Sequence, residues 1–139
     1  MDTESLVTDT ERELRILSTA LTEPHERECL LCYVYRMLEY GCTGLRWAVR
    51  YRDIRAPRAT AMERRLGAKG GYCDCEIFLN GYQPTQELWT PSREYDEDGV
   101  TCVDDAEWPE QLPPCPGVRA GSTQGCTMWV RQRRRGWCW

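Results

Sequence analysis

Cysteine pairs at short spacing are the residues of this sequence with the clearest chemistry. Cys29-Leu-Leu-Cys32 is a CxxC pair, and Cys73-Asp-Cys75 is a CxC pair inside the stretch GGYCDCEIFLN. The remaining cysteines occur singly, at Cys42, Cys102, Cys115, Cys126 and Cys138. Thiolates are ligands of Zn²⁺, which takes four tetrahedral ligands in a closed structural site, and of iron–sulfur clusters. Two short pairs far apart in the sequence therefore predict one or two zinc ions, with an iron–sulfur cluster as the alternative cofactor.

Helix geometry limits which cysteines can share an ion. Sulfur atoms on one zinc ion lie within about 4 Å of one another. If the residues between Cys32 and Cys42 are helical, these two cysteines lie about 15 Å apart at 1.5 Å per residue. The CxC pair then shares an ion either with the CxxC pair or with Cys42. In the second case, the CxxC pair can share another ion with the two cysteines of CPGVRAGSTQGC. Over both arrangements the predicted metal ligands are Cys29, Cys32, Cys42, Cys73, Cys75, Cys115 and Cys126.

His25 is the single histidine of the sequence. Its spacing of four and seven residues from Cys29 and Cys32 would place all three on one helical face, where the imidazole could be a fourth ligand. A surface position beside Pro24 is the simpler interpretation, and we expect it.

A longer motif surrounds Cys42 and the CxC pair. It consists of a cysteine shortly before a Leu-Arg-aromatic helix start, in GCTGLRW, and of GG-aromatic-CDCE followed by an apolar stretch and Asn80. These residues resemble an uncharacterised bacterial family catalogued as a domain of unknown function. A longer subgroup also resembles the chain at ECLLCYVYRM, APRATAMERRLG and CPGVRAGSTQGC, so the likeness covers about residues 28–130.

The resemblance implies no established activity, but it implies that Cys42, Cys73 and Cys75 act together. Shorter relatives often carry a histidine where this chain has Gly44, which would give three thiolates and one imidazole. This chain departs from that pattern, and Cys102 or a water could take the fourth position.

Four helices are expected to position the thiols. Leucines at helical spacing predict a helix at residues 4–22, ended by Pro24. Further helices are predicted at residues 26–40, 44–55 and 57–66, with glycines after two of them as stop signals. The stretch EIFLN fits either a short strand or a helical turn. Six prolines at residues 81–126 predict a long irregular segment.

The predicted fold class is therefore mainly α, a small helical domain stapled by metal ions with a long irregular C-terminal segment. We expect an N-terminal helix at residues 1–25, a cysteine-rich metal-binding domain at residues 26–130 and a basic tail at residues 131–139. The apolar residues of this 139-residue chain include nine cysteines and one phenylalanine, and its aliphatic content is low. Small domains of this kind depend on added cross-links.

The expected cellular compartment favours metal binding by the cysteines over disulfide formation. The N-terminus MDTESLVTDTERELR has neither the basic nor the apolar region of a secretory signal, and the longest apolar run, CLLCYVY, is too short to span a bilayer. We expect a cytoplasmic protein without membrane association, in a compartment where thiols stay reduced.

Charge is distributed in blocks. Residues 46–73 carry a net charge of +6 and residues 74–110 a net charge of −10. Such blocks predict another protein as the partner, or complement each other within the fold. The acidic block disfavours nucleic acid, although the tail RQRRRGWCW could contribute phosphate contacts and stacking. The basic residues that could meet an acidic partner are Arg46, Arg50, Arg55, Arg58, Arg64 and Arg65.

No catalytic set is evident. The sequence has no Walker or Rossmann glycine motif, and the zinc-deaminase pattern does not match because His25 is followed directly by Glu26 and then Arg27. The enzymatic alternative is an open zinc site with Asp74 or Glu76 as base, and a further alternative is a thiol or metal redox sensor. The preferred prediction is a zinc-binding, non-catalytic binding or regulatory module.

Overall fold

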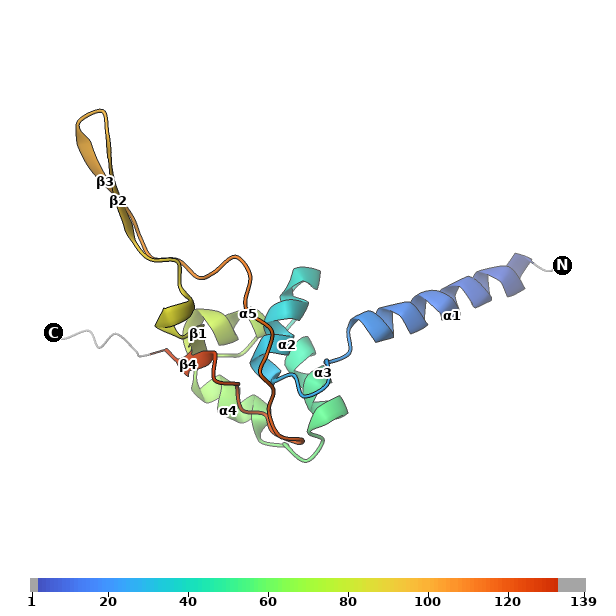
Figure 1. The fold of residues 1–139 in the computed structure, drawn as a ribbon. Coiled ribbons are helices and arrows are strands. Elements are labelled where there is room, and N and C mark those ends of the chain that lie inside the picture. The colour runs from blue at the N-terminus through green and yellow to red at the C-terminus, as the bar shows by residue number, and fades with distance from the viewer. Residues whose placement is uncertain (1–2, 133–139) are drawn as a thin grey trace.

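The computed structural model describes residues 3–132, with side chains from residue 8 onward. A central body carries two projections (Figure 1). Helix α1 (Thr3–Leu21) extends from one side, and a hairpin of β2 (Arg93–Glu97) and β3 (Val100–Asp104) stands out from another. Among the described residues, no helix has the length and apolar character needed to cross a membrane.

Short helices make up most of the body. The α-helices there are α2 (Leu30–Met37), α3 (Arg46–Arg55), α4 (Met62–Ala68) and α5 (Asp74–Glu76). The 3₁₀ turns η1 (Leu38–Tyr40) and η3 (Gln86–Leu88) and the π-helical turn η2 (Ile77–Gly81) are the other helical elements of the described residues.

The core surrounds α2. Tyr33 of α2 is fully buried and its ring lies 5.7 Å from that of Tyr51 on α3. On another side, Phe78 of η2 and Trp129 pack with ring centroids 5.1 Å apart. Because no body helix exceeds about three turns, most of the stability of these helices must come from this packing rather than from helix propensity.

A second small sheet brings the end of the described chain back to the body. Strand β1 (Tyr82–Pro84) pairs antiparallel with β4 (Trp129–Arg131), with Pro84 opposite Trp129. Trp129 is buried, so this pairing places the segment before β4 directly against the core.

The prediction of a mainly α fold is wrong. The structure is 42% helical and 14% strand, with two small antiparallel sheets, and is therefore mixed α and β. Three of the strands lie in residues 81–126, which were predicted to be irregular. The β2–β3 turn has Asp98 at φ 52° and Gly99 at φ 78°. Positive φ at both central residues is the two-residue hairpin turn that favours Asp-Gly, so this dipeptide was the sequence signal of the hairpin.

The predicted helices exist with shifted boundaries. The second begins at Leu30 rather than residue 26, because Cys29 has extended backbone and caps it. The fourth begins at Met62 rather than at Pro57. The stretch EIFLN forms helical turns of α5 and η2, not a strand. In the predicted basic tail, Arg131 belongs to β4, and residues 133–139 lie outside the described residues.

The junction after α1 is held by side chains from the body. Arg50 Nε donates to the Thr22 carbonyl over 3.1 Å, and the Tyr33 hydroxyl donates to the same oxygen over 2.6 Å. Arg55 donates to the Pro24 carbonyl over 2.9 Å. Two of the six arginines predicted to meet an acidic partner therefore bind the protein's own backbone, as cationic groups commonly do near helix C-termini.

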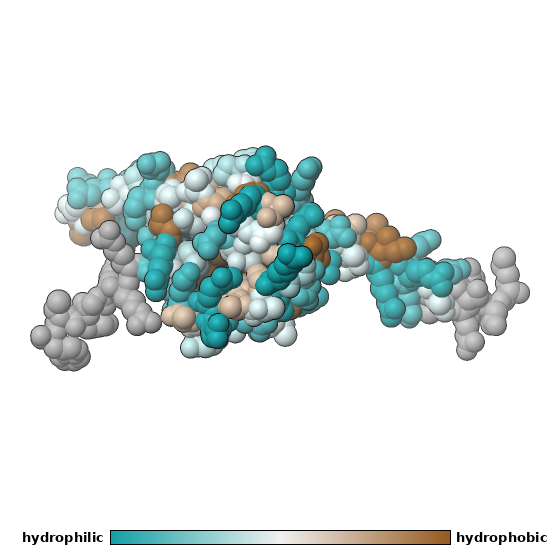
Figure 2. Space-filling model, turned by 90° about the horizontal axis from the view of Figure 1, so that it is seen from below, coloured by the Kyte–Doolittle hydropathy of each residue, from teal (hydrophilic) through white to brown (hydrophobic). Residues whose placement is uncertain are grey.

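Beyond this junction, residues 8–21 of α1 are exposed. Leu14, Leu17 and Leu21 are 61%, 59% and 63% exposed. Figure 2 shows apolar surface on this helix next to a more polar body.

The turn of the β2–β3 hairpin yields a first prediction. Gly99→Val should weaken the hairpin by about 1–2 kcal/mol, because a branched residue is strained at positive φ. The hairpin stands away from the core, so the melting temperature of the whole protein should stay the same while hydrogen exchange accelerates at the hairpin amides. Asp98→Asn is the control, because asparagine tolerates this conformation. A fall in global melting temperature for Gly99→Val would contradict this account.

Candidate metal centre

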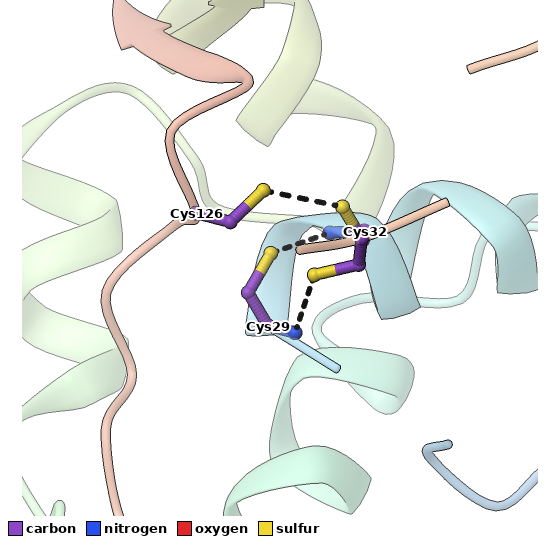
Figure 3. A group of neighbouring side chains, drawn as sticks. Cys29, Cys32 and Cys126 are labelled. Atoms are coloured by element: carbon purple, nitrogen blue, oxygen red, sulfur yellow. Dashed lines mark hydrogen bonds between the residues drawn. The ribbon is translucent and has the colours of Figure 1, made fainter. Parts of the chain in front are cut away.

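Four cysteines meet at the N-terminus of α2. The Sγ atoms of Cys29, Cys32, Cys115 and Cys126 all lie within 4.8 Å of one another. Figure 3 shows the Cys126 side chain pointing from the segment before β4 toward Cys29 and Cys32. The Sγ atoms of Cys32 and Cys126 are 3.7 Å apart. Two sulfurs bound to one tetrahedral zinc at 2.3 Å would be about 3.8 Å apart, so the group has the size of a single-ion site.

Backbone and indole N–H groups point at these sulfurs. The Cys32 N–H donates to Cys29 Sγ over 3.3 Å, and the Cys29 N–H donates to Cys115 Sγ over 3.4 Å. Gly117 N–H donates to Cys115 Sγ over 3.4 Å, and Trp129 Nε1 donates to Cys32 Sγ over 3.3 Å. Donors aimed at sulfur stabilise the anionic thiolate, which is the form that binds metal.

The C-terminal half of the group is held in place by the backbone. Val118 N–H donates to the Arg27 carbonyl over 2.9 Å. Gly117 has φ 97°, and a Cβ there would lie 3.3 Å from Arg27 Cβ, so glycine allows the close approach of the two segments. This contact brings Cys115 onto the start of α2.

The thiols of Cys29, Cys32 and Cys126 shift one another's pKa. The hydrogen bond from the Cys32 thiol lowers the pKa of Cys29 to about 6, and donating that bond raises the pKa of Cys32. Burial raises the pKa of Cys126 to about 12. Cys29 therefore ionises more readily than Cys32 and Cys126. A bound cation that takes all of them as thiolates must release their protons, so occupancy depends on pH.

A second group consists of three cysteines near the surface. The Sγ atoms of Cys42, Cys73 and Cys75 lie within 4.8 Å of one another. Cys73 Sγ and Cys75 Sγ are 3.2 Å apart, and Cys75 N–H donates to Cys42 Sγ over 3.4 Å. Cys42 is exposed and the other two are half-buried. Burial, together with the neighbouring Cys75 thiol, raises the pKa of Cys73 to about 12.

Asp74 fixes the second group to α3. Its carboxylate accepts from the N–H groups of Trp47 over 2.9 Å and Ala48 over 3.1 Å, and its own N–H donates to the Gly44 carbonyl over 2.8 Å. The carboxylate therefore supplies the cap that α3 lacks in its own sequence, where Leu45 makes no side-chain bond.

The same contacts exclude Asp74 from the role of base in an open zinc site. The residue is 0% exposed, and both carboxylate oxygens point at backbone donors. Burial raises the pKa of Asp74. In the sequence, the residue between two cysteines gave no sign that it caps a helix starting 28 positions earlier.

Glu28 performs a similar task at the first group, and the sequence analysis did not identify it. The residue is 7% exposed and its carboxylate accepts two bonds from Arg36, one of 2.8 Å. Its carbonyl accepts from the Tyr51 hydroxyl over 2.7 Å. These contacts hold the backbone directly before Cys29.

The structure does not bring every candidate together. The His25 side chain is 72% exposed and belongs to neither cysteine group. Cys102 lies on β3 and is likewise in neither group. Cys138 lies outside the described residues. Of the two arrangements left open by the sequence, the structure has the one that joins the CxC pair to Cys42.

Comparison with known proteins finds a family match over part of the chain and no activity. Residues 30–80 match the family model described as a protein of unknown function (DUF2695). The expected resemblance to an uncharacterised domain family is thereby confirmed. No curated protein and no solved structure gives a significant match. The matched residues contain the whole three-cysteine group, whereas three cysteines of the four-cysteine group lie outside them.

The capping role of Asp74 yields a second prediction. Asp74→Ala should lower the free energy of unfolding by about 2 kcal/mol, because it leaves two helix N–H groups buried without acceptors. Asp74→Asn keeps one acceptor oxygen and should lower the free energy of unfolding by less. Chemical denaturation measures both.

Asp53→Ala is the matched control, on the helix that Asp74 caps. The Asp53 side chain is 64% exposed, so its removal should change stability by no more than about 0.5 kcal/mol. Equal effects of Asp74→Ala and Asp53→Ala would refute the capping role.

Proposed function

We propose that this protein binds zinc at both cysteine groups and works as a non-catalytic binding or regulatory module in the cytoplasm. The observation that carries the proposal is the four-cysteine group, in which three of the cysteines are buried and N–H donors face the sulfurs. Four thiolates in a closed, buried arrangement are the ligand set of a structural zinc site.

The spacing of the sulfurs supports a single ion over an iron–sulfur cluster. In a cluster the cysteine sulfurs bind different iron atoms, with sulfide ions between the irons, and must lie farther apart than ligands of one ion. All four sulfurs here lie within 4.8 Å of one another. Thiolate ligands in tetrahedral geometry favour zinc among the common divalent cations.

Metal at the four-cysteine group would join α2 to a segment without regular secondary structure. Residues 105–128 form no helix or strand, yet Cys115 and Cys126 both lie in this segment. A cross-link to α2 closes long loops of chain, which lowers the entropy of the unfolded state. Zinc would therefore be part of the folding free energy of this protein.

The partner we propose is another protein that contacts a charged face. The β2–β3 hairpin stands away from the body, and its acidic residues Glu94, Asp96, Glu97 and Asp98 are exposed. A protein with a basic surface would be attracted to this projection. The same charge would repel nucleic acid.

A redox sensor is the second candidate. It is favoured by one observation, the surface position of the three-cysteine group, in which Cys42 is exposed and the Cys73 and Cys75 sulfurs are 3.2 Å apart. Exposed thiols are the accessible targets of oxidants.

Metal analysis of protein purified without oxygen is the direct test. We expect two zinc ions per chain, no visible absorption, and few thiols that react before a chelator is added. Cys42→Ser should lose one zinc and keep the fold, whereas Cys32→Ser should lose the other zinc and release the C-terminal segment.

Cys102→Ser is the control, because Cys102 belongs to neither group and its substitution should leave both ions in place. A metal-free protein with all thiols reactive and its fold intact would contradict the proposal. Visible absorption together with bound iron would indicate an iron–sulfur cluster instead of zinc.

A further inference from the structure

The three-cysteine group offers one ligand fewer than a tetrahedral zinc takes. We propose that the Glu76 carboxylate is the fourth ligand, and that the resulting three-sulfur, one-oxygen site exchanges its metal with solvent. This inference rests on the proposed zinc binding and names the ligand set and behaviour of its second site.

Glu76 is placed beside the thiols by α5. Cys73 is the N-cap of this turn and Glu76 its third residue, so their side chains meet on one side. Glu76 Oε1 lies 3.3 Å from Cys73 Sγ. A sulfur and an oxygen bound to one zinc at 2.3 Å and about 2.1 Å would be about 3.6 Å apart, so these two atoms already have the separation of neighbouring ligands.

Glu76 has the freedom to complete the set. Neither carboxylate oxygen of Glu76 lies within 4.8 Å of all three sulfurs, so rotation about the Glu76 side-chain bonds is needed to bring an oxygen to the ion. Among the described residues Glu76 makes no ion pair, and its carboxylate accepts a hydrogen bond from the Cys73 thiol. Three thiolates and a carboxylate at this spacing would repel one another strongly, and a divalent cation removes that repulsion.

The surroundings of this site favour exchange. Cys42 is exposed, whereas Cys29 in the other group is 0% exposed. A ligand released from metal on this surface can be solvated by water at once. Asp74 holds the CxC turn on α3 through backbone bonds that do not involve the sulfurs, so the site can keep its shape when the metal leaves.

Cobalt is the probe for this ligand set. Wild-type protein is first given one equivalent of Zn²⁺ to fill the buried group and is then titrated with Co²⁺, while visible absorption reports the bound sulfurs. We expect one Co²⁺ to bind with the spectrum of a three-sulfur site, and a chelator to remove it with the fold and the first zinc intact.

Glu76→Gln should weaken Co²⁺ binding at this site by about tenfold or more and shift the ligand-field bands, because the amide oxygen is a poorer ligand. Glu76→Cys should intensify the sulfur-to-cobalt absorption, because it supplies a fourth thiolate. Glu87→Gln is the matched control on a neighbouring exposed turn and should behave as wild type. Retention of the first zinc in every variant confirms that each one is folded.

The possible failures are distinguishable. Glu76→Gln that binds Co²⁺ with wild-type affinity and spectrum would overturn the role of Glu76 and leave zinc binding intact. Cobalt that a chelator removes only when the protein unfolds would overturn exchange. Wild-type protein that keeps one zinc and binds no Co²⁺ would overturn the second site itself.

Discussion

The convergence of four sulfurs on the first turn of α2 is the constraint on which the rest of the structure depends. Cys29 and Cys32 belong to this turn, and the other two sulfurs arrive from a segment that has no helix or strand of its own. The core beside it includes aromatic contacts of Trp129 of β4 with Phe78 and Tyr35. Without a cross-link at this point, residues 105–128 would be held against the body by side-chain packing, such as that of Trp108 and Met128, and by single backbone bonds such as Val118 N–H to the Arg27 carbonyl.

Two buried carboxylates hold the backbone next to the two cysteine groups in position. Glu28 and Asp74 are the buried charged residues among those described, and each is directly next to a cysteine of one group. Glu28 is neutralised by Arg36, and Asp74 is satisfied by the N-terminus of α3. A buried charge without partners is costly, so each carboxylate fixes the position of its neighbours. The thiols are thus arranged by contacts that exist independently of metal.

Local patterns predicted a large part of the molecule. The CxxC and CxC pairs and the helix-distance argument led to the same seven cysteines that the structure gathers into two groups, although metal binding itself remains a proposal. Helical spacing of leucines predicted α1. The Asp98-Gly99 dipeptide was a hairpin signal in the sequence, but the prolines around it led to the prediction of an irregular segment. The cap that Asp74 provides and the indole bond from Trp129 to Cys32 join residues 26 and 97 positions apart, and no local pattern records such contacts.

X-ray absorption at the zinc edge tests the central claim most directly, because it counts the atoms bound to the metal. The account predicts a first shell dominated by sulfur at about 2.3 Å, with seven sulfurs and one oxygen shared between two zinc ions. It also predicts four sulfurs around the one zinc left in Cys42→Ser. A first shell dominated by oxygen or nitrogen in the wild-type protein would contradict the account.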